Sequence, residues 1–365
     1  MKLLIAGGGT GGHLFSGVAT AEALRAEGRH EILFVGTARG LEATLLPKLG
    51  WPVRFVTVGG LKRMGPWRTA VNLFKVPLSF LQSLAILLRF KPNVALGVGG
   101  YASGPAMLAA WLTGVPTAIV EQNSYPGVTN RLLGRLARAV IIHFERAAEY
   151  FPPKKIRRFG NPVRQAFAAL AAEEATPMPE GKLRLLITGG SQGAHAINVA
   201  FADAALKLAK MKDRLVIRHQ TGEADAEAVR RAYAQAGLAA TVEAFIDDMP
   251  AAYRAADLVV CRAGAGNCAE LAAAGKPALF VPLPTAADDH QTANAAELVG
   301  AGGAWMVQQR GFTADYVRDF AERLLNKPDE LAAKLAAARG QGRPDAALRT
   351  AALLTELARG KGAQP

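Results

Sequence analysis

The stretch that decides the fold occurs twice in the chain. Residues 2–13 read KLLIAGGGTGGH, an apolar run that passes directly into glycines, and residues 183–194 repeat the arrangement as LRLLITGGSQGA. An apolar run of this length predicts a buried β-strand, and a helical pattern follows each glycine loop. Strand, glycine loop and helix in this order are typical of nucleotide-binding α/β units, so we expect two such units.

Each half continues with short apolar runs separated by helical stretches, a pattern typical of parallel sheets covered by helices. The first half is predicted to have a helix at about 15–26 and strands at 31–35, 94–98, 117–120 and 139–142. The second half is predicted to have a helix from about 196 and strands at 214–219, 241–245, 257–261 and 277–281. The expected fold class is therefore α/β, with two Rossmann-like, doubly wound domains.

The boundary between the domains is expected near Asn161-Pro162-Val163-Arg164, before a stretch rich in Ala, Glu and Pro. This gives an N-terminal domain of residues 1–162 and a C-terminal domain of residues 163–344. Residues 345–359 have an amphipathic pattern, and we expect a last helix there that packs back on the first domain. Two domains also suit a chain of 365 residues.

Composition excludes several classes of protein. With 50% hydrophobic and 20% charged residues, the chain can bury a large core and is not disordered. Two cysteines, Cys261 and Cys268, cannot build a disulfide framework, and the sequence has no Cys/His cluster that would suggest structural zinc. The first residues do not follow the pattern of a secretory signal peptide. We therefore expect a protein of a reducing compartment.

The net charge of +13 comes entirely from the first half. Residues 1–162 hold 20 Lys/Arg and 7 Asp/Glu, whereas residues 163–365 hold 23 of each. No acidic residue occurs between Glu42 and Glu121, while eight basic residues do. This asymmetry predicts an anionic partner for the first half: a membrane surface, a phosphorylated substrate or a nucleic acid. A nucleic acid is disfavoured, because stacking aromatics are not interleaved with the basic residues and no nucleic-acid motif occurs.

Residues 71–90 are strongly apolar and are surrounded by basic residues. The longest uncharged span, Val76–Leu88, contains Pro77 and is too short to cross a bilayer, which takes roughly 20 apolar residues. Two interpretations remain open, a core helix with solvated flanks and a segment that lies on an anionic membrane, and we favour the second. The candidate membrane-contacting residues are Lys62, Arg63, Trp67, Arg68, Phe74, Lys75, Leu78 and Phe80.

The first glycine loop contains Gly7-x-Gly9-x-x-Gly12, which formally matches a dinucleotide-binding fingerprint. A nicotinamide enzyme also needs an acid at the end of the second strand, and that strand ends in Phe34-Val35-Gly36-Thr37. The loop is therefore expected to bind a diphosphate through backbone N–H groups at a helix N-terminus. His13 follows the loop, close to Thr10, and is a candidate general base because the ordinary histidine pKa of about 6.5 allows proton uptake at neutral pH.

Further glycine-rich or polar motifs follow other strands, where open α/β sheets bind ligands. They are Gly97–Pro105, Glu121-Gln122-Asn123, Gly189–Gly193, Arg262–Glu270 and Asp288–Gln291. Glu270 lies about one turn into a predicted helix, where its carboxylate suits a ribose diol; the alternative is a partner for the helix dipole. The sequence has no Asp-x-Asp motif, so we expect no metal.

Together these motifs resemble a specific family, the lipid II-forming N-acetylglucosaminyltransferases of bacterial peptidoglycan synthesis. The resemblance runs from residue 3 to about 355 and rests on Gly8–His13, Gly99–Pro105, Glu121–Asn123, Gly160–Arg164, Gly189–Ala194 and Asp288–Gln291. It implies a GT-B fold with two domains facing a central cleft. It also implies an inverting transfer, without metal or cofactor, of N-acetylglucosamine (GlcNAc) from UDP-GlcNAc to the C4 hydroxyl of undecaprenyl-diphosphate-N-acetylmuramoyl-pentapeptide.

The resemblance also implies roles for individual residues. His13 would be the base and Glu121 a second catalytic residue. The acceptor-binding residues would be Thr10, Gly11, Gly12, Tyr101, Asn123 and Asn130. The donor-binding residues would be Arg164, Ser191, Gln192, Ile246, Ala265, Gly266, Asn267, Glu270, His290 and Gln291. The sequence departs from the family pattern in three places. Ser16 replaces a common proline, and Val120 stands where a histidine often precedes Glu121-Gln122-Asn123, which removes one acceptor-side candidate. The loop after Arg262 lacks hydroxyls, so its N–H groups or Asn267 would contact the diphosphate.

The implied partners are UDP-GlcNAc, the lipid-linked muramoyl peptide, an anionic membrane surface and other cell-wall synthesis proteins, with roles in cell shape and division. The implied location is peripheral, on the cytoplasmic face of the bacterial plasma membrane. Three alternatives stay open at this point. Two are enzymes of the same fold, a diacylglycerol glycosyltransferase and a UDP-sugar 2-epimerase, and the third is a basic nucleic-acid-binding protein.

Overall fold

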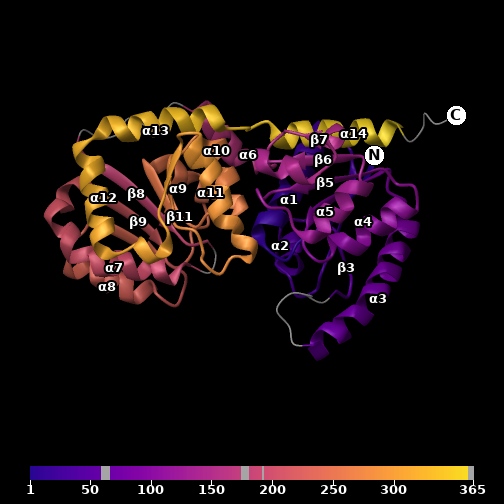
Figure 1. Cartoon of the computed structure of the whole chain (residues 1–365), viewed down its shortest axis with the longest axis horizontal. Helices are drawn as coiled ribbons and strands as arrows, with labels where there is room; N and C mark the ends of the chain where they lie inside the picture. Colours follow the sequence, from indigo (N-terminus) through magenta and orange to yellow (C-terminus); the bar gives the residue numbers. More distant parts are fainter. Residues whose placement is uncertain (59–65, 174–180, 191–192, 361–365) are drawn as a thin grey trace. The chain divides into compact units, whose positions relative to one another are not determined.

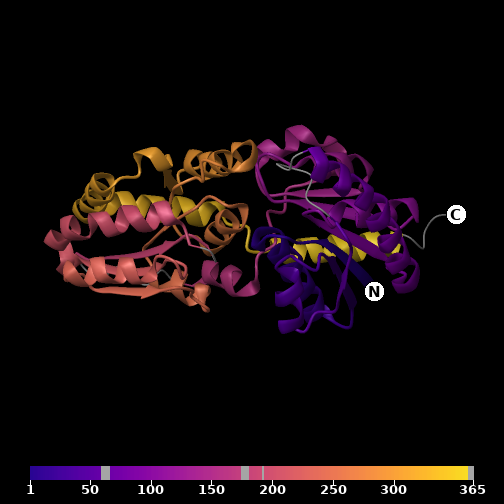
Figure 2. The same ribbon diagram turned by 90° about the horizontal axis from the view of Figure 1, so that it is seen from below.

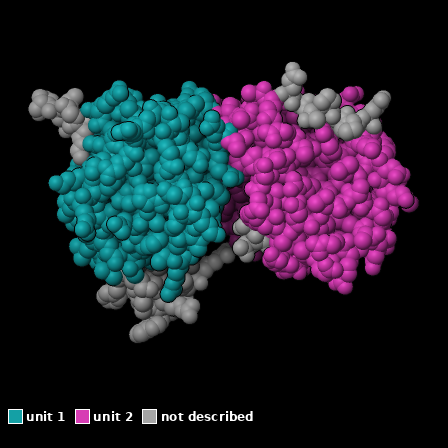
Figure 3. Space-filling view, turned by 180° about the vertical axis from the view of Figure 1, so that it is seen from behind, with its two compact units in different colours: residues 1–165, 345–365 teal, residues 166–344 magenta. Residues whose placement is uncertain are grey.

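The computed structural model describes residues 1–58, 66–173, 181–190 and 193–360, and for residues 66–75 it describes the helical backbone alone. The chain divides into two compact units (Figure 3). Unit 1 comprises Met1–Gln165 with Asp345–Pro365, and unit 2 comprises Ala166–Pro344. The first break between the units falls three residues after the boundary expected from the sequence.

Unit 1, in which Figure 1 labels the strands β3, β5, β6 and β7, is built on a seven-stranded parallel sheet. The strand order is β3-β2-β1-β4-β5-β6-β7. Its strands are β1 (Lys2–Gly7), β2 (Glu31–Gly36), β3 (Val53–Phe55), β4 (Val94–Gly99), β5 (Thr117–Glu121), β6 (Ala139–Ile142) and β7 (Ile156–Arg157). Ala6 is paired with Val35 on one side of β1 and with Gly97 on the other. The first glycine loop therefore leaves the sheet from a central strand, beside the end of β4.

Helices cover both faces of this sheet because alternate strand residues point to opposite sides. Leu3 and Ile5 of β1 are buried in a core with α1 and α14, whereas Leu4 and Ala6 are buried in a second core with α3, α4 and α5. The C-terminal helix α14 packs against α1. The helices of unit 1 are α1 (Gly11–Glu27), α2 (Glu42–Lys48), α3 (Pro66–Phe90), α4 (Ser103–Leu112), α5 (Val128–Leu136) and α14 (Ala346–Arg359), with 3-10 turns η1 (Glu145–Tyr150) and η2 (Pro153–Lys155).

Unit 2 repeats the architecture on a six-stranded parallel sheet with the order β10-β9-β8-β11-β12-β13. Its strands are β8 (Leu183–Thr188), β9 (Leu215–Gln220), β10 (Ala240–Glu243), β11 (Leu258–Cys261), β12 (Ala278–Phe280) and β13 (Ala304–Met306). Leu185 and Ile187 of β8 are buried against α7, α8 and α12, and helices lie on both faces of the sheet (Figure 2).

The helices of unit 2 are α7 (His195–Leu208), α8 (Ala226–Gln235), α9 (Met249–Ala255), α10 (Ala265–Ala274), α11 (His290–Gly300), α12 (Ala314–Asn326) and α13 (Pro328–Gln341). The short helix α6 (Gln165–Ala169) lies at the break between the units. The 3-10 turns are η3 (Leu170–Ala172), η4 (Ala209–Arg214), η5 (Ala287–Asp289) and η6 (Gln309–Gly311).

The predicted fold class, α/β with two doubly wound parallel sheets, is confirmed. Three short strands, β3, β7 and β13, were not expected from the sequence, and each lies at the edge of its sheet. Helix α1 begins at Gly11, earlier than the apolar pattern indicates, so the last glycines of the first loop form its first turn. Helix α3 continues through Pro77. Across the described ranges, no helix combines the length and apolar character that crossing a membrane requires.

Candidate active site

The first glycine loop follows β1 and leads directly into α1. Gly7, Gly8 and Gly9 all have positive φ, and the Gly8 nitrogen donates a hydrogen bond to the Gly99 carbonyl, at 3.2 Å. A Cβ at Gly100 would overlap the Gly8 carbonyl. The loop after β1 and the loop after β4 are therefore in direct backbone contact, which requires glycine at position 100. Thr10 is the N-cap residue of α1, and the following amides, at Gly11 and Gly12, belong to a helix N-terminus, which favours anions.

A buried carboxylate, that of Glu42, holds this loop. The Glu42 carboxylate accepts hydrogen bonds from the Gly9 nitrogen at 2.7 Å and from the Thr37 nitrogen and hydroxyl, each at 2.8 Å. A Cβ at Gly36 or Gly40 would overlap its side chain, so glycine is required there. This residue was not predicted from the sequence. A usable signal was an acidic residue shortly after the second predicted strand, with glycines at positions 36 and 40 that leave room for its carboxylate.

His13 lies in the first turn of α1 and contacts the end of β5. Its Nδ1 lies 3.1 Å from Oε1 of Gln122, and Nε2 of Gln122 donates to the Val98 carbonyl at 2.9 Å. Gln122 is fully buried. A Cβ at Gly99 would lie 2.8 Å from His13 Nδ1, so this edge of the imidazole packs against backbone. In the sequence, Gln122 stands within the Glu121-Gln122-Asn123 motif, and no role was predicted for it.

Glu121 sits at the end of β5 with two of the predicted acceptor-binding residues. Its carboxylate accepts from the Asn123 nitrogen at 2.9 Å, from Asn123 Nδ2 at 3.3 Å and from Asn130 Nδ2 at 2.8 Å. Glu121 is 1% exposed, and this burial raises its pKa to about 7 although the hydrogen bonds oppose the shift. A carboxyl group of this kind changes its protonation near neutral pH.

Other predicted residues of unit 1 lie near the same strand ends. Tyr101 is about half exposed, on the turn after β4. The Ser16 hydroxyl lies 2.7 Å from Asn161 Oδ1 and 3.0 Å from the Gly12 carbonyl. The serine that replaces the common proline therefore connects the first turn of α1 to the Gly160–Arg164 segment. Arg164, expected to bind the donor, stacks its guanidinium on the Phe15 ring at 4.6 Å within unit 1.

The glycine loop of unit 2 is anchored by a buried glutamine. Gln220 Nε2 donates to the Gly190 carbonyl at 2.7 Å, and Gln220 Oε1 accepts from the Ile246 nitrogen at 3.0 Å. The side chain of Ile246 is buried and packs in the interior of unit 2. The contact with Gln220 is made by its backbone nitrogen. A Cβ at Gly193 would overlap the Thr221 carbonyl. The predicted donor residues Ser191 and Gln192 lie outside the described residues.

The loop after β11 leads into α10, whose first turn contains Ala265, Gly266 and Asn267. Asn267 Nδ2 donates to the Arg262 carbonyl at 3.1 Å, so the Asn267 amide stabilises the turn. The groups suited to bind an anion here are therefore the backbone N–H groups at the start of α10. The Arg262 guanidinium donates to the Val281 carbonyl at 3.0 Å and to Gln309 at 2.7 Å. No role was predicted for Arg262, and it connects the ends of β11 and β12.

Glu270, His290 and Gln291 belong to the two helices that follow β11 and β12. Glu270 lies on α10 and is partly exposed. His290 Nδ1 lies 2.6 Å from the Ala287 carbonyl, and Gln291 Oε1 accepts from the Leu283 nitrogen at 3.0 Å. In unit 2 these residues therefore gather at the carboxyl ends of adjacent parallel strands, where sheets of this kind bind nucleotides.

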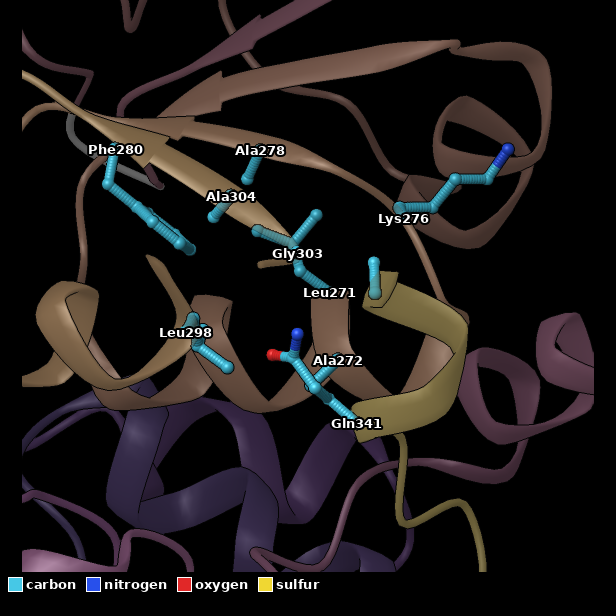
Figure 4. Close-up of a pocket in the computed structure, with 10 residues that line it drawn as sticks. Leu271, Ala272, Lys276, Ala278, Phe280, Leu298, Gly303, Ala304 and Gln341 are labelled. Carbon is cyan, nitrogen blue, oxygen red and sulfur yellow. The ribbon is translucent and has the colours of Figure 1, made fainter. Parts of the chain in front are cut away.

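A separate pocket of unit 2 lies between α10, α11, α13 and the strands β12 and β13 (Figure 4). Its lining is mostly apolar, with Leu271, Phe280 and Leu298 among its residues. Lys276 Nζ donates to two backbone carbonyls and Gln341 Nε2 to two others, and burial lowers the pKa of Lys276 to about 8. We therefore place the candidate site at the strand ends and not in this pocket.

The candidate membrane segment is helix α3. Lys62 and Arg63 lie outside the described residues, as do the side chains of Trp67, Arg68, Phe74 and Lys75. Leu78 is exposed, whereas Phe80 packs partly against the core and is therefore a weaker candidate for membrane contact than the sequence indicated. The outward face of α3 instead exposes Leu81 and Leu88, each 60% exposed. The neighbouring helix α4 adds Trp111, at 44%.

Comparison with known proteins agrees with this geometry. Residues 3–142 match the glycosyltransferase family 28 N-terminal domain, and residues 184–350 match the glycosyltransferase family 28 C-terminal domain. Two curated relatives, from Anaeromyxobacter dehalogenans and Myxococcus xanthus, are 45% and 46% identical; the alignments cover 100% and 98% of this chain and 95% and 93% of theirs. Both are named UDP-N-acetylglucosamine--N-acetylmuramyl-(pentapeptide) pyrophosphoryl-undecaprenol N-acetylglucosamine transferase.

Solved structures give the same result. The crystal structure of Acinetobacter baumannii MurG is 33% identical, with a TM-score of 0.78, and the match covers 97% of this chain and 99% of that one. The UDP-GlcNAc 2-epimerase of Neisseria meningitidis, at 17% identity and a TM-score of 0.68, shares the fold alone. The chain therefore belongs to glycosyltransferase family 28, with the GT-B fold, and within it to the MurG family of N-acetylglucosamine transferases.

Proposed function

We propose that this chain transfers GlcNAc from UDP-GlcNAc to the C4 hydroxyl of undecaprenyl-diphosphate-N-acetylmuramoyl-pentapeptide, the step from lipid I to lipid II. The observation that carries the proposal is the similarity, over nearly the full length, to relatives of 44–47% identity that are named for this transfer. The chain is an N-acetylglucosaminyltransferase of peptidoglycan synthesis.

The two units divide the work. Unit 1 takes the lipid-linked acceptor, which fits the +13 charge of residues 1–162 and the cluster of His13, Glu121, Asn123 and Asn130. Unit 2 takes UDP-GlcNAc, with the amides of the α10 N-terminus at the diphosphate and Glu270 at the ribose hydroxyls.

The reaction is an inverting displacement. His13 removes the proton from the C4 hydroxyl of the muramoyl sugar as that oxygen attacks C1 of GlcNAc. The bond from C1 to the diphosphate oxygen breaks, its electron pair leaves with UDP, and the α-linked donor becomes a β-linked product. Helix N-termini and Arg164 stabilise the charge on the leaving diphosphate, so the step needs no metal.

Glu121 acts on this reaction indirectly, through the asparagine side chains that it holds. A side chain that is 1% exposed is poorly placed to touch an acceptor, whereas its hydrogen bonds fix the amides of Asn123 and Asn130. Asn130 is itself 4% exposed and donates to Glu121, whereas Asn123 is partly exposed. We therefore propose that Glu121 acts by orienting Asn123 and does not transfer a proton directly to the sugar.

Unit 1 also docks on the membrane that holds the acceptor. The exposed Val76, Leu78, Leu81 and Leu88 of α3, together with Trp111 of α4, supply apolar anchors, and Arg89 and Lys91 follow at the end of the helix. Anchors flanked by cations suit an anionic lipid surface. The location would be peripheral, on the cytoplasmic face of the plasma membrane, among other cell-wall synthesis proteins.

A turnover assay tests the function directly. The purified chain is mixed with UDP-GlcNAc, a short-chain lipid I analogue and EDTA. We expect one UDP released for each GlcNAc transferred and a β-linked disaccharide. Conversion of UDP-GlcNAc to its 2-epimer without use of the acceptor would overturn the proposal in favour of an epimerase, and loss of all transfer in EDTA would overturn its metal-independent part.

A further inference from the structure

Gln122 has both ends of its side-chain amide in fixed positions. Its Nε2 donates to the Val98 carbonyl at 2.9 Å, and its Oε1 lies 3.1 Å from Nδ1 of His13. The side chain is 0% exposed, so protein groups set its orientation. Gln122 thereby connects the ends of β4 and β5 with the first turn of α1.

The orientation of this amide determines where the imidazole carries its hydrogen. A backbone carbonyl can only accept a hydrogen bond, so the amide nitrogen of Gln122 must face Val98. The amide oxygen then faces His13, and it too can only accept. His13 Nδ1 must therefore be the donor, and in the neutral imidazole the lone pair is on Nε2.

We infer that Gln122 is a positioning residue that holds His13 in the tautomer with hydrogen on Nδ1, which makes Nε2 the atom that takes the acceptor's proton. The inference rests on the proposed function in one respect, that His13 is the base. Gly99 lies beside the same edge of the ring, since a Cβ there would come within 2.8 Å of His13 Nδ1. In the other tautomer, Nδ1 and the amide oxygen would be two facing acceptors.

His219, which is fully buried, provides an internal reference in the same chain. Asn198 Nδ2 donates to the Thr221 carbonyl at 2.8 Å and to Asp225 at 2.7 Å, so its Oδ1 must accept from His219 Nε2, at 3.0 Å. His219 Nδ1 lies 2.8 Å from the Tyr233 hydroxyl and accepts from it. By the same reasoning, His219 carries its hydrogen on Nε2, the opposite tautomer to His13.

The test is a nitrogen NMR spectrum of the imidazoles in the full chain at pH 8, with assignments from His13→Asn and His219→Asn. We expect His13 to show a protonated Nδ1 and an unprotonated Nε2, and His219 to show the reverse. Gln122→Met removes the acceptor and should abolish the Nδ1-protonated form of His13. The backbone amide spectrum of unit 1 should stay as in wild type and reports that this unit folds, while the His219 signals of unit 2 stay unchanged. Should Gln122→Met fail to fold, the wild-type spectrum still decides: an unprotonated Nδ1 on His13 overturns the inference.

Kinetics separate this inference from the proposed function. Gln122→Met should lower kcat by about 10- to 100-fold, part of the roughly 10²–10⁴ that a general base contributes, with the KM for UDP-GlcNAc unchanged. An unchanged His13 tautomer in Gln122→Met would overturn the role of Gln122. An altered tautomer with an unchanged kcat would leave the tautomer assignment standing and would remove His13 from the role of base.

Discussion

The carboxylate of Glu42 lies 2.7 Å from the backbone nitrogen of Gly9, across 33 positions of sequence, and both its oxygen atoms are used to hold the first glycine loop and the turn after β2. In many dinucleotide-binding folds an acid after the second strand holds a ribose. Here the acid that follows β2 is Glu42, and it binds the protein's own first glycine loop instead. It thereby fixes the backbone of that loop, which we propose contacts the acceptor.

Replacement of Glu42 should therefore loosen unit 1. Hydrogen bonds to a charged group contribute about 1.5–3 kcal/mol each, so Glu42→Ala should lower the free energy of unfolding by a few kcal/mol and raise the KM for the acceptor. Urea unfolding and acceptor titrations measure the two effects. Glu31→Ala is the matched control, because Glu31 forms only an exposed ion pair with Lys2. Equal stability losses for the two variants would contradict the role of Glu42.

Glu270 should matter for the donor alone. Loss of a charged hydrogen bond to the ribose should raise the KM for UDP-GlcNAc in Glu270→Ala by about 10- to 100-fold, equivalent to about 1.5–3 kcal/mol. The exposed Glu322 of α12 provides the control variant, Glu322→Ala. If the donor KM and kcat of Glu270→Ala both match those of the control, Glu270 is a helix-dipole partner and not a ribose ligand.

Membrane binding should need both the apolar face of α3 and its cations. The paired change Leu81→Ser and Leu88→Ser should abolish sedimentation with anionic vesicles, while turnover of a water-soluble acceptor analogue continues. Wild-type binding should weaken with salt, since the Debye length falls from about 10 Å at 0.1 M to about 3 Å at 1 M. Leu206→Ser, on an exposed leucine of unit 2, is the control. Equal binding to neutral and anionic vesicles would exclude the electrostatic part.

Acid should destabilise unit 2 through His219. Burial lowers its pKa from the ordinary 6.5 to about 3, so the unfolded chain binds the extra proton between these values. Its contribution to stability is complete above pH 6.5 and is lost as the pH falls toward 3, by up to about 1.4 kcal/mol per pH unit.

Replacement of His219 by Phe should remove this slope although it lowers stability overall. Urea midpoints between pH 4 and 7, followed by pulse-labelled hydrogen exchange in β8 and β9, measure it. A variant that keeps the wild-type slope would assign the acid sensitivity to another group.

The sequence was informative wherever a property is local. Buried strands such as β1 and β8, and the glycine loops after them, follow from runs of apolar residues and from the conformations that only glycine adopts easily. The edge strands β3, β7 and β13 were not predicted from the sequence, because two or three residues are too few to show a periodic pattern.

The residues that hold the candidate site were harder to find. Glu42, Gln122 and Gln220 each connect groups that the fold brings together from distant positions. Gln220 joins the backbones of Gly190 and Ile246, and Gln122 joins the Val98 carbonyl to the His13 side chain. Their chemistry is ordinary, and only the tertiary structure shows what they contact. His13 and Glu121 were predicted as site residues because both belong to motifs that follow strands: His13 stands at the helix start after the first glycine loop, and Glu121 ends its strand.

We assign proton removal to unit 1 and donor binding to unit 2, and the variant His13→Ala separates the two roles. Its kcat and its affinity for UDP are measured beside wild type, with the partly exposed His30 replaced in the control variant His30→Ala. We expect kcat to fall by about 10²–10⁴ while UDP binds as before. A loss of UDP affinity with an unchanged kcat would contradict this assignment, because His13 would then belong to the donor site.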